Sequence, residues 1–149
     1  MRRPCCIAIT LVVVMFAASA AGFPKPLKPK TAGQLAAVVA ATGLGCDDFE
    51  AADPSNSVTV SGIPKPISQG HCTIDGQRST VSMFASKDDL AAVLHATPTL
   101  GCSFAKATGV TTLRYVAGAT WTISTPSSVT GPKLANALGA KRVTYHCKK

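Results

Sequence analysis

The fold is decided by the stretch Cys72-Thr-Ile-Asp-Gly-Gln-Arg-Ser-Thr-Val-Ser-Met-Phe84. At its centre stands the pair Asp75-Gly76, which is typical of a two-residue hairpin turn. The residues after the turn favour a strand, because β-branched and aromatic side chains such as Val81 and Phe84 fit a pleated surface. The stretch therefore predicts a β-hairpin whose second strand runs from Gln77 to Phe84.

A helix is expected directly after this hairpin. Ser86-Lys-Asp-Asp89 has the spacing of a capping box, in which a hydroxyl side chain accepts a hydrogen bond from the first helical turn. We expect the helix over Leu90–Ala96 and its end before Pro98. The next expected elements are a second hairpin with strands over 111–116 and 119–124, a helix over 132–138 that Gly139 closes, and a last strand over 142–147.

The chain before the hairpin is expected to hold one helix and several loops. Thr31-Ala-Gly-Gln34 is another capping box, and the apolar spacing after it predicts about three helical turns that end at Gly43. The segments that follow are an acidic loop with room for a short strand over 47–56, a β-prone segment over 57–61 and a proline-lysine loop over 63–67.

The order helix, strands, helix, strands, helix, strand predicts two β-hairpin-plus-helix halves. Consecutive hairpins make an antiparallel sheet, and helices that alternate with them must bury an apolar face against it. We therefore expect an α+β fold: an antiparallel β-sheet with the helices packed on one face, stabilised by disulfide bonds.

The first residues have the pattern of a cleavable secretory signal. Arg2 and Arg3 precede an apolar run over 5–18, and Ala18-Ser19-Ala20 fits the small-residue rule for cleavage after Ala20. The alternative is an uncleaved anchor, but the run is shorter than the roughly 20 residues that a membrane-spanning helix needs. We expect a signal peptide over 1–20, an extended Pro/Lys-rich arm over 21–30 and a single α+β domain over 31–149.

The chain is basic, with a net charge of +8 over its 149 residues. Loss of Arg2 and Arg3 leaves thirteen basic and seven acidic residues, a net charge of +6. The lysines are spread along the chain without a dense cluster, whereas nucleic-acid binding favours a basic stripe with interleaved aromatic residues. The composition thus predicts a general attraction to anionic surfaces, and nucleic acid is not an expected partner.

Four cysteines remain after the signal: Cys46, Cys72, Cys102 and Cys147. An even number in an exported chain favours two disulfides, and no C-x-x-C pair is present for zinc. Three pairings are possible. We favour Cys46 with Cys72 and Cys102 with Cys147, because each bond then closes one half of the chain.

The Cys-Thr-Ile-Asp-Gly motif, the capped helix and Val116-Ala-Gly-Ala-Thr-Trp-Thr-Ile123 resemble small exported, largely uncharacterised proteins of actinobacteria that contain disulfides. The resemblance covers roughly residues 35–138. It implies the α+β fold and a bond between Cys46 and Cys72, and it supplies no activity and no catalytic residue. Cys102 and Cys147 depart from that pattern.

Residues with catalytic chemistry are few. The three histidines are His71, His95 and His146, and two of them with a lysine could cleave RNA by acid–base catalysis, although nothing in their spacing demands it. We keep His71 and His146 as the candidates and expect each histidine to have an ordinary structural or surface role. Serine-elbow, phosphate-loop and His-Glu zinc motifs are absent.

The one acidic cluster comprises Asp47, Asp48, Glu50 and Asp53. Its oxygens are calcium ligands in principle, but the EF-hand spacing is missing, so we expect a solvated loop and no metal or other cofactor.

The sequence therefore predicts a secreted, non-enzymatic binding module that acts at the cell envelope or outside the cell. Its expected partners are an anionic envelope polymer or another secreted protein, with no transmembrane span after signal cleavage. Two alternatives stay open: a small basic secreted hydrolase, nuclease-like, that uses His71 or His146, and a secreted inhibitor or effector that binds another protein through an exposed apolar face.

Overall fold

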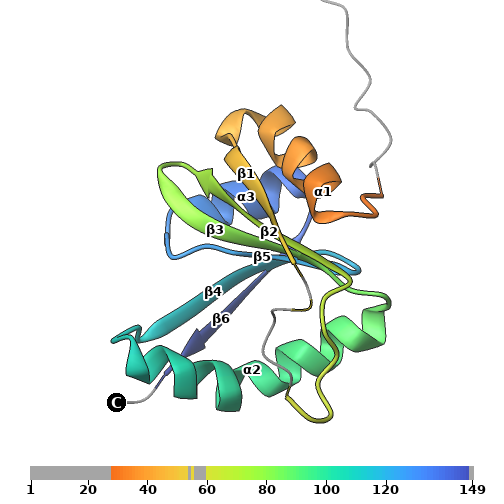
Figure 1. The fold of residues 1–149 in the computed structure, drawn as a ribbon. Helices are drawn as coiled ribbons and strands as arrows, with labels where there is room; N and C mark the ends of the chain where they lie inside the picture. The colour runs from red at the N-terminus through yellow and green to blue at the C-terminus, as the bar shows by residue number, and fades with distance from the viewer. Residues whose placement is uncertain (1–27, 54, 56–59, 148–149) are drawn as a thin grey trace, which may run out of the picture.

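The hairpin around Asp75-Gly76 forms as its sequence predicts. Both residues have positive backbone φ angles, +51° and +72°, which the two-residue turn requires and which Asp and Gly tolerate. The strands pair directly from Ile74 and Gln77 outward to Ser68 and Met83. A computed structural model gives the arrangement of residues 28–53, 55 and 60–147 (Figure 1).

Around this hairpin a single sheet of six antiparallel strands is built in the order β1-β2-β3-β5-β4-β6. The strands are β1 (Asp47–Ala52), β2 (Ser68–Ile74), β3 (Gln77–Met83), β4 (Thr112–Ala117), β5 (Trp121–Ser124) and β6 (Lys141–His146). The helices are α1 (Ala32–Val39), which runs on into a wide turn η1 (Ala40–Leu44), α2 (Lys87–Ala107) and α3 (Thr130–Leu138). The α+β class, the antiparallel sheet and the two hairpin-plus-helix halves are confirmed.

Local signals place most of the helix ends. The Thr31 hydroxyl accepts from the Gln34 amide at 3.2 Å, and the Ser86 hydroxyl accepts from the Asp89 amide at 3.0 Å, so both predicted capping residues begin their helices. Gly139 ends α3 in the left-handed conformation. The acidic segment over 47–56, expected as a loop with room for a short strand, forms the edge strand β1 over Asp47–Ala52, paired with β2.

The helices lie on both faces of the sheet, which differs from the expectation that they share one. In Figure 1, α1 and α3 cover one face, while α2 runs below β4 and β6 on the other. The reason is that side chains along β4 and β6 alternate between the two faces. Val116 points to the α1/α3 side, whereas Leu113 and Tyr145 point to the opposite side. Large side chains on that second face need a cover of their own, and α2 supplies it.

The main core lies between the first face of the sheet and the helices α1 and α3. Its fully buried members come from both helices and four strands: Leu35, Val39, Ile74, Val81, Met83, Val116, Ile123 and Leu134. A smaller apolar cluster under α2 contains Leu113, Ala105, Cys102 and Cys147. The sheet is therefore packed unequally: within the described residues, α2 covers the second face near β4 and β6.

The helix α2 continues through Pro98 to Ala107, so the expectation that it ends before the proline is wrong. Proline has no N–H to donate to the carbonyl four residues earlier, which here is that of Leu94. The hydroxyl of Tyr145 on β6 donates to this carbonyl at 2.7 Å. The sheet thus supplies the hydrogen bond that Pro98 cannot make, and the helix continues.

Two disulfides join Cys46 to Cys72 and Cys102 to Cys147, the pairing that the sequence favours. The first lies in the main core beside β1 and β2, and the second ties the C-terminal half of α2 to the end of β6. Each layer of helix on sheet therefore carries one covalent link. Cross-links across 26 and 45 residues restrict the unfolded chain and should each stabilise the fold by about 3–4 kcal/mol.

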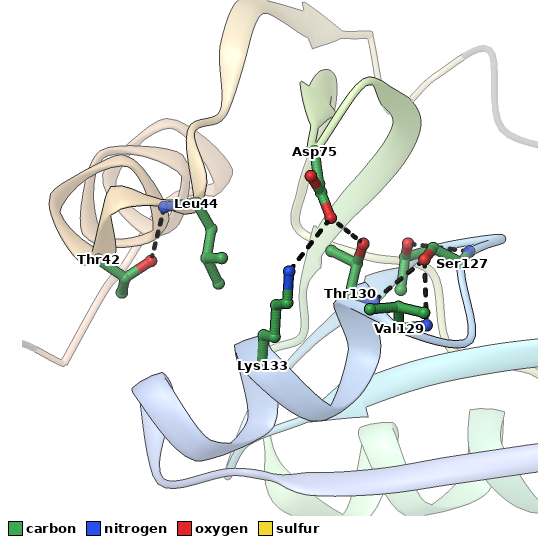
Figure 2. A network of polar contacts seen from close by, with 8 residues as sticks. Thr42, Leu44, Asp75, Ser127, Val129, Thr130 and Lys133 are labelled. Carbon is green, nitrogen blue, oxygen red and sulfur yellow. Dashed lines mark hydrogen bonds and ion pairs between the residues drawn. The ribbon is translucent and has the colours of Figure 1, made fainter.

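The predicted hairpin turn is also fixed to α3 from the side (Figure 2). The Thr130 hydroxyl donates to the Asp75 carboxylate at 2.9 Å, and the Lys133 ammonium lies 3.9 Å from the same oxygen. The Ser127 hydroxyl accepts from the amides of Val129 and Thr130 and so caps the start of α3. These contacts hold the two halves of the domain in register.

The signal over 1–20, most of the Pro/Lys-rich arm and residues 57–59 of the β-prone segment lie outside the described residues. Residues 63–66 form a loop, as expected. None of the helices in the described part of the chain combines the length and the apolar character that a membrane span requires.

Candidate functional site

The structure does not bring the candidate histidines together. His71 lies on β2, where its Nδ1 is 3.1 Å from the Thr80 hydroxyl, and His146 is exposed at the end of β6. Three strands separate β2 from β6 in the sheet, a distance of about 19 Å at the usual strand spacing. His95 is exposed on α2. His71 and His146 are therefore too far apart to share one substrate atom.

The acidic cluster is dispersed along the edge strand. Glu50 lies 4.0 Å from the Arg78 guanidinium in an exposed pair, and Asp53 accepts from the Ser55 amide, which lowers the pKa of Asp53. Within residues 28–53, 55 and 60–147, no three His, Cys, Asp or Glu side chains converge to hold a metal ion.

A hollow with a defined lining lies on the second face of the sheet, beside α2. It has a volume of about 320 Å³, is open on one side, and is called here the hydroxyl cleft. Its floor is formed by polar side chains of four strands: Gln69, Thr80, Ser82, Tyr115, Thr122 and Ser124. Its walls are Val93, Leu94 and Thr97 of α2 on one side and Ile63, Pro64, Pro66 and Phe84 on the other.

The floor of the hydroxyl cleft has a regular pattern. Thr80-Val-Ser82 on β3 lies antiparallel to Thr122-Ile-Ser124 on β5, so that Thr80 faces Ser124 and Ser82 faces Thr122. Val81 and Ile123, between them, point into the main core on the other face. Two similar tripeptides thus place four hydroxyls in two rows, about 4.8 Å apart across the strands.

The hydroxyls of the floor differ in what they already bind. The Gln69 side-chain amide donates to the Ser82 hydroxyl at 2.9 Å, and Thr80 contacts His71. In the described part of the chain, Thr122, Ser124 and Tyr115 make no side-chain hydrogen bond, although every fully enclosed side-chain nitrogen or oxygen there has a partner. Their hydroxyls therefore open into the cleft, where a ligand or water can pair with them.

Tyr115 stands at the side of the floor nearest α2. Burial raises the pKa of its phenol, and the neighbouring Tyr145, whose ring centre is 6.3 Å away, raises it further. The phenol is therefore neutral at physiological pH and can both donate and accept a hydrogen bond.

The wall formed by α2 is held by the contacts that carry this helix through Pro98. Tyr145 binds the Leu94 carbonyl, and the Thr97 hydroxyl donates to the Val93 carbonyl at 2.8 Å. The Cys102–Cys147 bond fixes the helix one turn farther along. The shape of the hydroxyl cleft thus depends on the second disulfide layer.

A second hollow lies at the Cys102–Cys147 bond and is more open. His146 and Lys106 both line it, together with Pro98, Thr99 and Ser103. A lone histidine beside a lysine offers one proton acceptor, but among the described residues no carboxylate and no second histidine lines this hollow to complete an acid–base pair.

The comparisons assign no family. The chain matches no family model, no curated protein and no solved structure.

Reasoning from the sequence missed the hydroxyl cleft, although a signal was present. The alternation of hydroxyl and β-branched residues in Thr80–Ser82 and Thr122–Ser124 predicts one polar face and one core face for each strand. That these two polar faces adjoin, and that α2 and the loop over 63–66 form walls around them, depends on the strand order β3-β5.

Proposed function

We propose that this protein is an exported, disulfide-stabilised binding module that acts at the cell envelope or outside the cell without catalysing a reaction, and that its ligand occupies the hydroxyl cleft. The signal pattern over 1–20 and the two disulfides support export, because disulfides persist in oxidising compartments. The observation that carries the proposal is that the hydroxyls of Thr122, Ser124 and Tyr115 line an open hollow and make no hydrogen bond within the described residues.

Binding without catalysis is favoured by the side chains that the cleft contains. Among its lining residues in the described part of the chain, the polar side chains carry hydroxyls and one amide, and the titratable group is Tyr115, whose pKa burial raises. General acid–base catalysis needs a group that titrates near the working pH, and nucleophilic catalysis needs a base beside the nucleophile. His71 contacts Thr80 at the edge of the floor but is not part of the lining.

A titration followed by NMR tests the proposal. The oxidised protein, beginning at Ala21, is titrated with the soluble fraction of an enzymatic digest of cell envelopes. We expect amide shifts that cluster at β3, β5 and the loop over 63–66 and leave the exposed face of α1 unchanged. Shifts absent from the cleft, or confined to the hollow at His146, would contradict the assignment of the site.

The nuclease-like hydrolase remains the second candidate, because His146 and Lys106 line one hollow. It predicts that purified oxidised protein cleaves RNA and that His146→Ala abolishes the cleavage. The binding proposal predicts intact RNA after incubation with the protein.

A further inference from the structure

The hydroxyl cleft is uncharged. Among its lining residues, all of them in the described part of the chain, there is no lysine, arginine, aspartate, glutamate or histidine. A charged ligand group placed there would lose its hydration without gaining an opposite charge, which is unfavourable. The basic charge of the chain therefore does not extend into the cleft, and an anionic polymer is a poor match for this site.

The polar atoms of the floor favour a ligand that also carries hydroxyls. Each hydroxyl of Thr122, Ser124 and Tyr115 can donate one hydrogen bond and accept others, and so can each hydroxyl of a sugar. Thr122 and Ser124 lie two residues apart on β5, about 6.8 Å along the strand, and face Ser82 and Thr80 of β3 across one strand spacing, so two groups on opposite sides of one sugar ring can pair with the floor. The side-chain oxygen of Gln69 adds an acceptor, because its nitrogen already donates to Ser82.

The walls of the cleft also suit a sugar, because most of their side chains are apolar. Phe84 and the rings of Pro64 and Pro66 form one wall, and Val93 and Leu94 form the other. A sugar ring has hydroxyls at its rim and C–H groups on its faces, so it can satisfy a polar floor and apolar walls together. A peptide fits less well, because the backbone groups of the sheet are already paired with neighbouring strands and leave only side-chain hydroxyls for its amides.

We propose that the ligand of the hydroxyl cleft is an uncharged carbohydrate, held by one or two sugar rings with the rest of the glycan outside. This inference rests on the proposed function and names its ligand class. The volume of about 320 Å³ lies at the low end of ligand pockets, which span roughly 300–1,000 Å³, and suits a short glycan segment. The open side lets a longer chain leave the cleft.

The test uses neutral and anionic probes. The oxidised protein is applied to an array of neutral oligosaccharides and titrated by NMR with N-acetylglucosamine trimer, mannotriose and maltotriose; a heparin hexasaccharide and inorganic phosphate are the anionic probes. We expect at least one neutral glycan to shift the Gln69 side-chain amide and the backbone of β3 and β5. Binding of the anionic probes alone, or of no neutral glycan on the array, would overturn the inference.

Matched variants locate the binding. Thr122→Val and Ser124→Ala each remove one cleft hydroxyl, and each should weaken binding of the neutral glycan about 2- to 10-fold, which corresponds to one hydrogen bond. Thr144→Val makes the same change as Thr122→Val on the other face of the sheet and should leave the affinity unchanged. Equal losses in Thr122→Val and Thr144→Val would contradict the placement, and a far-UV spectrum confirms that each variant is folded.

The failure of the ligand class can be separated from the failure of the proposed function. The envelope digest is treated with periodate, which cleaves neighbouring hydroxyls of sugars, or with a protease. Cleft shifts that vanish after periodate and survive the protease support a carbohydrate. Cleft shifts that survive periodate and vanish after the protease would refute the carbohydrate and retain the binding module. No shift with the untreated digest would refute the proposed function itself.

Discussion

Replacing Tyr145 by phenylalanine tests how α2 continues through Pro98. The Tyr145 hydroxyl donates at 2.7 Å to the Leu94 carbonyl, which the missing N–H of the proline leaves without its helical partner. Tyr145→Phe removes this donor and keeps the ring. One such hydrogen bond contributes about 0.5–1.5 kcal/mol net to stability, and leaving the partly buried Leu94 carbonyl without a partner costs further stability. Because Leu94 is half-buried, we expect the free energy of unfolding to fall by about 1–2 kcal/mol.

The assay is urea unfolding at pH 7, followed by circular dichroism with both disulfides intact. The expected loss corresponds to a decrease in Tm of about 3–10 °C for a domain of this size. Tyr115→Phe is the matched control. Its hydroxyl makes no hydrogen bond within the described residues, so its removal should change the free energy of unfolding by less than about 0.5 kcal/mol.

A double-mutant cycle decides whether the hydrogen bond acts through the proline. Pro98→Ala restores an N–H at position 98 that can pair with the Leu94 carbonyl along the helix. In this background Tyr145→Phe should lose less stability than in the native chain, with a coupling of about 0.5–1.5 kcal/mol. An equal loss in both backgrounds would refute the account of how the helix passes Pro98.

The remaining predictions concern the cross-links, the turn and the pH dependence. Replacing both cysteines of the Cys102–Cys147 bond by serine should lower the free energy of unfolding by about 4 kcal/mol and expose the amides of the C-terminal half of α2 to hydrogen exchange. Loss of the Cys46–Cys72 bond should lower the free energy of unfolding by about 3.5 kcal/mol and leave those amides as protected as before. Asp75→Asn keeps an acceptor for the Thr130 hydroxyl and should change the free energy of unfolding by less than about 0.5 kcal/mol in urea. Asp75→Ala should lower it by about 1–2 kcal/mol, because alanine offers no acceptor and tolerates the positive φ poorly. Burial raises the pKa of Tyr115, so the contribution of its neutral phenol to folding stability is fully present below pH about 10 and is lost as the pH rises through the higher folded-state pKa. Urea midpoints measured from pH 8 to 11 should therefore fall less in Tyr115→Phe than in the native chain.

The elements that local chemistry determines could be predicted from the sequence. Asp75-Gly76 has the backbone tolerance that its turn needs, and the hydroxyls of Thr31 and Ser86 lie three residues before the amides that they cap. Such signals act within four residues, so no knowledge of the sheet is needed to use them.

The predictions that were wrong concern features that depend on contacts between distant parts of the chain. The extension of α2 through Pro98 needs Tyr145, which lies 51 residues from Leu94 in the sequence. The placement of α2 on the second face follows from the apolar side chains of Leu113 and Tyr145 there, once β4 and β6 pair. A proline by itself favours the end of a helix, and here the contact between Tyr145 and Leu94 overrides that local preference.

In the candidate site, too, the local pattern could be predicted from the sequence and the arrangement of distant segments could not. Each tripeptide, Thr80–Ser82 and Thr122–Ser124, predicts a polar face for its own strand. The cleft exists because β3 and β5 are neighbours and because α2 and the loop over 63–66 close it from two sides. His71 and His146, the residues that the sequence singled out by chemical type, lie apart from each other, and neither lines the cleft.

The central claim is that the hydroxyl cleft binds the ligand, and the NMR titration of Thr122→Val against Thr144→Val with the envelope digest tests it most directly. The account predicts that the shifts at β3 and β5 seen with the native chain persist in Thr144→Val and weaken in Thr122→Val. It is contradicted if both variants respond alike, or if the native chain shows no shift in the cleft.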